Sequence, residues 1–92
     1  MNPRFEWDEA KAQANHKKHR VSFREAASVF SDPLSHTVPD PDHSNEEQRF
    51  ITIGYSSRHR LLIVAYTERG DRIRIISARK LTRTERQTYE QE

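Results

Sequence analysis

Basic side chains of the kind that binds phosphate are concentrated near the C-terminal end of the sequence. Seven Lys or Arg residues and only two acidic ones lie between positions 69 and 86. Arg72 and Arg74 alternate with Ile73 and Ile75, which is the pattern of a strand with one buried and one presented face. The planar guanidinium group of arginine binds phosphate through two parallel hydrogen bonds. The stretch therefore predicts a rigid cationic surface for phosphate groups.

These residue types are sufficient for one reaction, the cleavage of RNA without a metal ion. A base removes the proton of a 2′-hydroxyl, the oxygen attacks the adjacent phosphorus, and an acid protonates the departing 5′-oxygen, while cations stabilise the phosphoryl oxygens. We expect Arg74, Arg79 and Lys80 to supply the positive charge, and His19 or Glu85 to transfer protons. Two structural roles compete with the last assignment: His19 suits a helix C-terminus, and Glu85 suits a helix cap.

The sequence gives less support to a metal site, a phosphate-binding glycine loop or a serine nucleophile. The chain has five histidines but no convincing metal-ligand spacing, and it has no cysteine. Its two glycines do not form a Gly-rich phosphate loop, and no serine nucleophile motif is present. We therefore expect neither a metal nor a cofactor.

Further basic residues are expected to bind the RNA backbone. Five Lys or Arg and no acid lie in residues 11–24, whereas five acids and no Lys or Arg lie in residues 31–48. The acidic loop, residues 40–47, should repel phosphate and lie at the rim of the RNA-binding face or away from it. The candidate RNA-binding residues are Lys11, Lys18, Arg49, Arg72 and Arg83.

Two helices are predicted before the sheet. A short strand around Phe5 and Trp7 is followed by Asp8, a helix cap, and by a helix over residues 9–18. Ser22 and Glu25 have the spacing of a capping box for a second helix. Its apolar face repeats at helical spacing and ends before Pro33; the face consists of Phe23, Ala26, Ala27 and Phe30.

Strands and a last helix follow. Alternation predicts a strand over residues 34–38, and three more over residues 49–55, 60–67 and 72–78, joined by hairpin-length links. The third of these four, apolar on both faces, should be central. Thr82 and Glu85 form a second capping box, so a short C-terminal helix should begin near Arg83. The fold class is α+β: two helices packed on an antiparallel sheet, in one domain over residues 1–92.

The length and composition set the remaining expectations. A chain of 92 residues can bury only a small core, so a deep cofactor cavity is not expected. The N-terminus has no apolar signal segment and no run reaches membrane-spanning length. We expect a cytoplasmic protein without membrane contact.

The whole chain resembles the BrnT toxins. The resemblance lies in Phe5-Glu6-Trp7-Asp8, Lys11, Asn15, Lys18-His19, Val21-Ser22-Phe23, Glu25-Ala26, Val29-Phe30, Arg49, Ile53-Gly54, residues 73–79, Glu85-Arg86 and Tyr89. It implies a RelE-like fold and a ribonuclease that arrests translation. The implied partners are RNA and a BrnA antitoxin, whose ribbon-helix-helix domain binds operator DNA. Pairing of such domains would give a complex of two toxins and two antitoxins.

One position departs from the family pattern. Arg20 stands where the family usually has glycine, which suits a left-handed helix cap. Arginine in that conformation would cost about 1 kcal/mol, or the turn would differ.

Two other functions fit the same arginine surface. The chain would then be a non-catalytic module that binds nucleic acid or an acidic protein, or an inactive toxin kept as an antitoxin-binding co-repressor. Metal-independent cleavage of RNA separates these readings from the ribonuclease.

Overall fold

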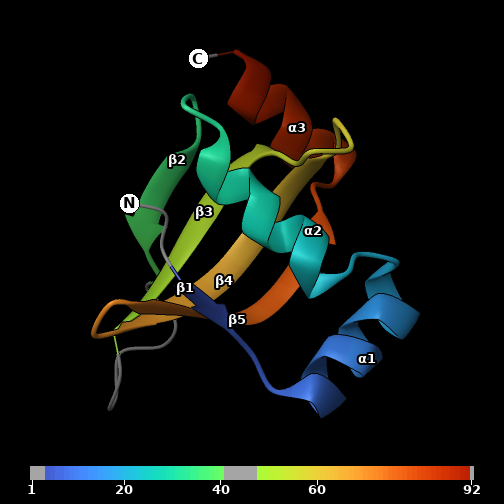
Figure 1. Cartoon of the computed structure of the whole chain (residues 1–92). Coiled ribbons are helices and arrows are strands. Elements are labelled where there is room, and N and C mark those ends of the chain that lie inside the picture. The colour runs from blue at the N-terminus through green and yellow to red at the C-terminus, as the bar shows by residue number, and fades with distance from the viewer. Residues whose placement is uncertain (1–3, 41–47, 92) are drawn as a thin grey trace.

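The computed structural model describes residues 4–40 and 48–91, which form one sheet with helices packed against it (Figure 1). The α+β class predicted from the sequence is confirmed. The elements in chain order are β1 (Arg4–Glu6), α1 (Glu9–His19), α2 (Phe23–Ser28), a 3₁₀ turn (Val29–Ser31), β2 (His36–Pro39), β3 (Arg49–Tyr55), β4 (Leu61–Arg69), β5 (Arg72–Lys80) and α3 (Arg83–Glu90).

The helices begin at the caps that the sequence predicts. The Asp8 carboxylate accepts a hydrogen bond from the Lys11 amide at 3.1 Å, and the Ser22 hydroxyl accepts one from the Glu25 amide at 3.0 Å. At α3 both halves of the capping box are present, between Thr82 and Glu85. The Glu25 side chain does not complete a second box, because its carboxylate is bound elsewhere, by Arg60 and Ser56.

The sheet has the strand order β1-β5-β4-β3-β2, with β4 in the centre as expected. The three long strands form the predicted antiparallel meander. The sheet is mixed rather than wholly antiparallel, because β1 pairs in parallel with β5, from Arg4 opposite Arg72 to Glu6 opposite Arg74. This pairing places the first and the last strand of the chain side by side at one sheet edge.

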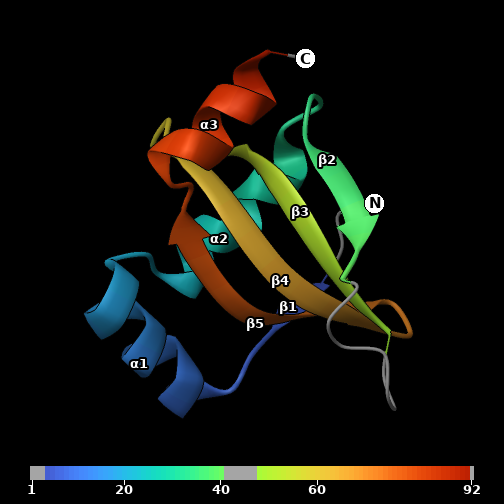
Figure 2. The same ribbon diagram turned by 180° about the vertical axis from the view of Figure 1, so that it is seen from behind.

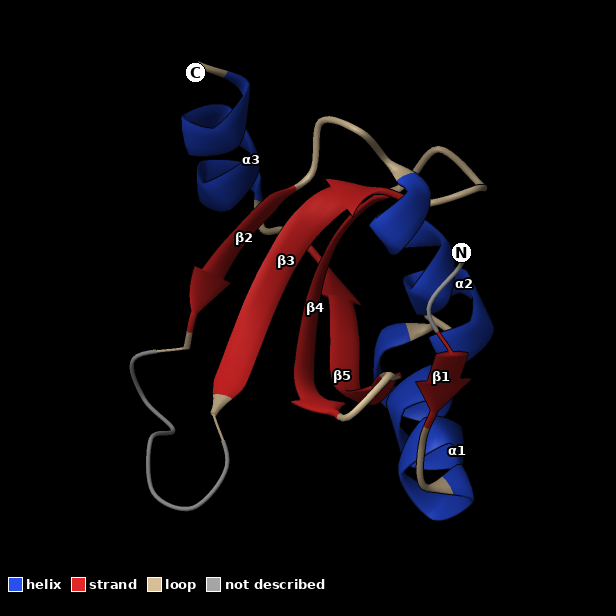
Figure 3. Ribbon diagram, turned by 60° about the vertical axis from the view of Figure 1, so that its left-hand side comes forward, coloured by secondary structure: helices blue, strands red, loops and turns tan. Residues whose placement is uncertain are grey.

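The core lies between one face of the sheet and the helices α1 and α2, which both cover that face (Figures 1 and 3). Apolar residues from α2, the turn before it and the central strands are buried there: Val21, Phe23, Ala26, Val29, Leu62, Val64, Ile75 and Ala78. Phe30, predicted on the helix face, is half-buried and contacts the rings of Phe5 and Tyr66, with centroids 5.2 and 4.9 Å away. Most of the interior is therefore aliphatic, with an aromatic cluster at one side.

A β-bulge in β5 decides which side chains face away from the helices. Ala65 pairs with Ser77, but the next residue, Tyr66, pairs with Ile75, so Ile76 is an extra residue in β5. Ile75 and Ala78 both face the helices, although they are three positions apart. The alternation of side chains is shifted by one residue beyond the bulge. Figure 2 shows the opposite face of the sheet, with α3 beside one end of the strands.

The turn between α1 and α2 contains the strained residue that the sequence indicates. Arg20 has φ 60° and ψ 31°, a left-handed conformation, and its amide donates a hydrogen bond to the His16 carbonyl oxygen. The Arg20 carbonyl oxygen accepts a hydrogen bond from the Arg60 guanidinium at 2.9 Å. Arginine thus occupies a helix-ending position that glycine adopts at lower cost.

Candidate active site

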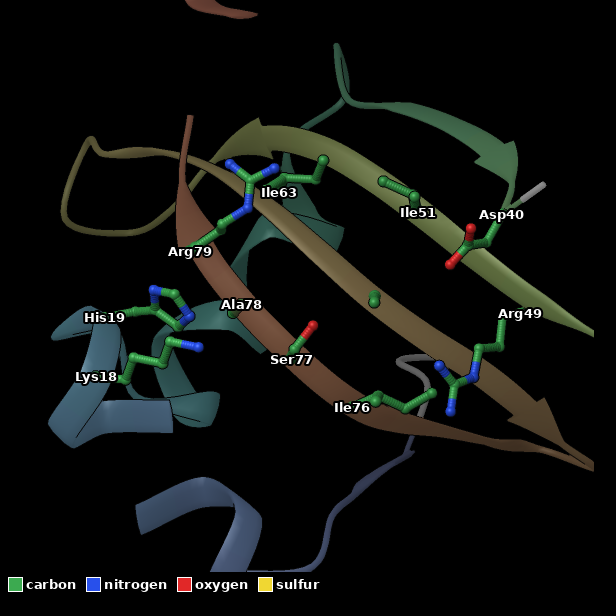
Figure 4. A pocket seen from close by; sticks show the side chains of 11 residues that line it. Lys18, His19, Asp40, Arg49, Ile51, Ile63, Ile76, Ser77, Ala78 and Arg79 are labelled. Atoms are coloured by element: carbon green, nitrogen blue, oxygen red, sulfur yellow. The ribbon is translucent and has the colours of Figure 1, made fainter. Parts of the chain in front are cut away.

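A groove of about 420 Å³ lies on the sheet face that α1 and α2 do not cover. Its floor is formed by aliphatic side chains of β3, β4 and β5, which are Ile51, Ile63, Ala65 and Ile76. Ala78, whose side chain faces the helices, also borders the groove. Its charged and polar walls are formed by Lys18, His19, Asp40, Arg49, Ser77 and Arg79. Figure 4 shows Lys18, His19 and Arg79 at one end of this groove, and Asp40 and Arg49 at the other. Five segments of the chain thus meet around one cavity.

The end of α1 and the bulged part of β5 form the basic end of the groove. Arg79 reaches this face because the bulge at Ile76 reverses the alternation of β5. Lys18 and His19 belong to the last turn of α1, which the Asn15 side chain holds against β5. These three side chains can place two positive charges and one imidazole around a phosphate.

The guanidinium of Arg79 is held by the Glu85 carboxylate of α3. Two hydrogen bonds of 2.8 and 3.0 Å join the two groups, and the Thr82 amide donates a third to Glu85 at 2.8 Å. The hydrogen bonds from Arg79, and to a lesser degree the one from the Thr82 amide, lower the pKa of Glu85 from 4.5 to about 2, and Glu85 in turn raises the pKa of Arg79. Glu85 is therefore ionised at neutral pH and is better suited to orient Arg79 than to accept a proton.

Two of the predicted cationic groups, Arg74 and Lys80, do not line this groove, although Arg74 lies on the same face of the sheet. The Arg74 guanidinium donates to the Glu6 carboxylate at 2.9 Å, and Arg72 donates to the other oxygen at 3.2 Å. Both bonds lower the pKa of Glu6, that from Arg74 most strongly. Lys80 is exposed and pairs with the buried Leu62, so its Cβ points to the helix side of the sheet. The structure does not gather Arg74, Arg79 and Lys80 around one point.

The remaining candidates are distributed over the surface. Lys11 on α1 and Arg83 at the start of α3 are exposed and do not line the groove, whereas Arg49 does. Asp40 and Ser77 line it as well, although the sequence analysis gave them no role in a site. The available signal was the position of Asp40, which is the first residue of the acidic loop and follows a predicted strand. Asp40 faces Arg49 across a hairpin, where the Asp40 amide donates a hydrogen bond to the Arg49 carbonyl oxygen at 2.9 Å. Residues 41–47 of that loop lie outside the described residues.

Comparison with known proteins identifies the family. The model of the family described as "Ribonuclease toxin, BrnT, of type II toxin-antitoxin system" matches residues 7–85. This chain belongs to the BrnT family. The resemblance noted in the sequence is thereby confirmed, and the ribonuclease reading is favoured over a non-catalytic module. The chain is the toxin of a type II pair, with RNA as its target and an antitoxin as its partner.

The solved structures agree with this assignment at the level of the fold. The toxin resembles the crystal structure of the Brucella abortus ribonuclease toxin BrnT, with 23% sequence identity and a TM-score of 0.65. The match covers 88% of this chain and 99% of the Brucella chain. No curated protein matched the toxin.

A second groove of the toxin, of about 400 Å³, lies between α3 and the strands β2 and β3. Tyr89 closes it: its hydroxyl donates to the Leu34 carbonyl oxygen at 3.2 Å, and its ring meets His36 edge-on. The residues of α3 are all at least partly exposed. This helix is therefore attached chiefly through the Tyr89 contacts and the pair between Arg79 and Glu85.

The described parts of the toxin contain neither a metal-binding cluster nor a membrane-spanning helix. In residues 4–40 and 48–91, no three His, Asp or Glu side chains are grouped in a way that would hold a metal ion. Within the same residues, no helix has the length and apolar character needed to cross a membrane.

Proposed function

We propose that the toxin cleaves RNA internally without a metal ion, and that the reaction takes place at the basic end of the groove. The observation that carries the proposal is the meeting of Arg79, Lys18 and His19 around one cavity. Cations and an imidazole are the groups that this reaction requires, because the RNA supplies its own nucleophile.

The reaction begins at the 2′-hydroxyl of the nucleotide before the cleaved bond. Its proton is removed, O2′ bonds to the adjacent phosphorus, and the bond from phosphorus to O5′ breaks as O5′ receives a proton. The products end in a 2′,3′-cyclic phosphate and a 5′-hydroxyl. Arg79 and Lys18 stabilise the negative charge on the phosphoryl oxygens, and His19 carries one of the two proton transfers, with water as its partner.

The phosphate takes over the hydrogen bonds that Arg79 gives to Glu85 in the free toxin. Both acceptors are oxyanions that match the fork of the guanidinium group. Glu85 thus holds Arg79 in a binding orientation until RNA arrives. Outside the groove, we assign Arg74 and Lys80, with the exposed Lys11, Arg72 and Arg83, to attraction of the RNA backbone.

The test is cleavage of RNA by the purified toxin in excess EDTA, with the new ends identified chemically. We expect 2′,3′-cyclic phosphate ends and an unchanged rate after chelation. His19→Ala and Arg79→Ala should each lower the rate at least about 100-fold. Arg24→Ala removes an exposed charge on α2, away from the groove, and serves as the control. Loss of cleavage in EDTA that Mg²⁺ restores would reject the metal-independent mechanism.

We propose further that expression of the toxin in the cytoplasm arrests translation and growth, and that a BrnA-like ribbon-helix-helix antitoxin neutralises it. Two antitoxin domains that pair on operator DNA would carry two toxins, giving a heterotetramer. Light scattering of the co-purified complex gives its mass directly. A mass equal to one toxin and one antitoxin would reject this stoichiometry.

A further inference from the structure

The two ends of the groove differ in charge, and only one of them suits a phosphate. Lys18 and Arg79 lie at the first end, whereas the second end combines the carboxylate of Asp40 with the guanidinium of Arg49 (Figure 4). Asp40 is 8% exposed. A carboxylate repels the phosphates of the RNA backbone. The second end must therefore receive an uncharged part of the substrate.

The floor between the two ends is apolar and partly accessible. Ile51, Ile63 and Ala65 are half-buried in β3 and β4, and Ile76 extends the floor into β5. Concave, mostly apolar surfaces with a few fixed polar groups are typical of small-molecule sites. The uncharged, flat and polar-edged part of RNA is its base.

The spacing of the ends fits a base next to the reacting phosphate. Ile63 lies opposite Arg79 and Thr67 lies opposite Arg49 across β4. Those positions are four residues apart in β4, or roughly 13 Å. The two arginines lie on the strands to either side of β4, roughly 10 Å apart, so their backbones are roughly 16 Å from each other. The arginine side chains shorten this gap by extending into the groove, so one nucleoside can bridge it.

We propose that Asp40 and Arg49 form a base-recognition subsite that prefers guanine; the inference rests on the ribonuclease function proposed above. Guanine presents two adjacent donors, N1–H and the N2 amino group, which match the two oxygens of one carboxylate. Its O6 and N7 atoms are acceptors that match an arginine fork. Among the four bases, guanine alone offers both patterns.

The two residues are positioned by rigid backbone. Asp40 directly follows Pro39 and Arg49 directly precedes Phe50, and Pro39 and Phe50 are the last residue pair between β2 and β3. The Asp40 amide donates a hydrogen bond to the Arg49 carbonyl oxygen there. Asp40 also takes part in polar interactions within the protein. A carboxylate has about four acceptor sites, so it can accept from a base in addition.

The experiment uses a set of short RNAs that differ at one base beside a single cleavable bond, carrying guanine, inosine, adenine, cytosine or uracil. Inosine lacks only the N2 amino group of guanine. Cleavage rates are measured for the toxin, for Asp40→Asn and for Asp8→Asn. Asp8→Asn makes the same charge change at the cap of α1, where asparagine caps equally well, away from the groove. A parallel titration with 2′-O-methyl RNAs, which cannot be cleaved, measures binding alone.

We expect the toxin and Asp8→Asn to prefer guanine over inosine by about tenfold, because one of the two hydrogen bonds to the carboxylate is lost. Asp40→Asn should treat the two bases alike. Cleavage of all five RNAs at one rate, or a guanine preference that survives Asp40→Asn, would overturn the subsite but leave the ribonuclease intact. Guanine-selective binding without cleavage would reject the ribonuclease and retain the subsite. Should Asp40→Asn weaken antitoxin binding but not base preference, this end of the groove is part of the antitoxin interface and the base subsite is rejected.

Discussion

The Asn15 side chain forms a pair of hydrogen bonds with the backbone of Ala78, as a residue of a neighbouring strand would. The Asn15 amide group donates to the Ala78 carbonyl oxygen at 2.9 Å, and its side-chain oxygen accepts from the Ala78 amide at 3.1 Å. A further hydrogen bond of 3.0 Å runs from Asn15 to the Val21 carbonyl oxygen. One side chain therefore fixes the end of α1, the turn after it and the part of β5 that leads into Arg79.

Substitution of Asn15 should lower the rate of RNA cleavage by more than the loss of stability alone explains. Lys18 and His19 lie three and four residues after Asn15, on the same side of the helix, and Arg79 directly follows Ala78. Asn15→Ala leaves buried backbone groups without partners and should cost about 3 kcal/mol. We expect kcat to fall at least about tenfold, with a smaller change in KM, at a temperature where the variant is folded.

Glu25→Ala is the matched control for that experiment. Its buried carboxylate binds Arg60, at 2.8 Å through Nε, and the Ser56 hydroxyl at 2.7 Å, outside the groove. Arg60, and to a lesser degree Ser56, lower the pKa of Glu25. Loss of this carboxylate should also cost about 3 kcal/mol, without a change in kcat. If both variants lost activity only in proportion to their unfolded fractions, Asn15 would have no positioning role.

Arg79→Ala and Lys80→Ala should differ, although the two residues are adjacent and both basic. Arg79 lines the groove, whereas Lys80 starts from the opposite side of the sheet. Loss of a preorganised donor typically raises the barrier by about 3 to 4 kcal/mol, so Arg79→Ala should abolish toxicity at equal expression. Lys80→Ala should weaken RNA binding only modestly and show a smaller salt dependence. Equal effects of the two substitutions on kcat would contradict the arrangement.

Acid should weaken the attachment of α3. The pKa of Glu85 is depressed in the folded toxin, to about 2 from 4.5. The pair with Arg79 therefore stabilises the fold fully above about pH 4.5, and this contribution is lost as the pH falls from there toward 2. Glu85→Gln retains a capping residue but not the charge. The difference in melting temperature between the toxin and this variant should shrink across that interval; a constant difference would show that the charge pair does not contribute.

Arg20→Gly should stabilise the toxin. Arg20 has a φ of 60°, where a side chain is strained and glycine is not. The gain is partly offset by the greater freedom of glycine in the unfolded chain, which leaves about 0.5 to 1 kcal/mol. Denaturant unfolding gives this difference directly, with Arg24→Gly as a control at an ordinary helical position. A destabilised Arg20→Gly would mean that the arginine side chain makes contacts that compensate for its backbone.

Local features of this fold were predictable, and features that depend on distant residues were not. Thr82 and Glu85 are three residues apart, and their capping box was predicted correctly. The second box was predicted from the same spacing, but Glu25 instead meets Arg60, 35 residues away. The parallel pairing of β1 with β5 joins Glu6 to Arg74 across most of the chain, and no local pattern indicates it.

In the candidate site, too, the residue types were predictable from the sequence, whereas their arrangement in space was not. The basic residues were identified by type, since arginine and lysine bind phosphate wherever they lie, and Lys18, His19, Arg49 and Arg79 do line the groove. Their separation from Arg74 and Lys80 depends on sheet register. Asp40 was assigned to an acidic loop because its neighbours are acidic, yet its carboxylate lines the groove opposite the basic end.

The extra residue at Ile76 decides that the side chain of Arg79, and not that of Lys80, enters the groove. Three residues separate Ile75, which faces the helices, from Arg79, which faces the groove. Pairing of β5 without the bulge, with every residue kept, would restore strict alternation, so that Lys80 would enter the groove and Arg79 would turn toward the helices. A two-pronged donor would be replaced by a single ammonium group, and Glu85 would lose the partner that keeps α3 in place. One unpaired residue in β5 thus separates two different surfaces built from the same side chains.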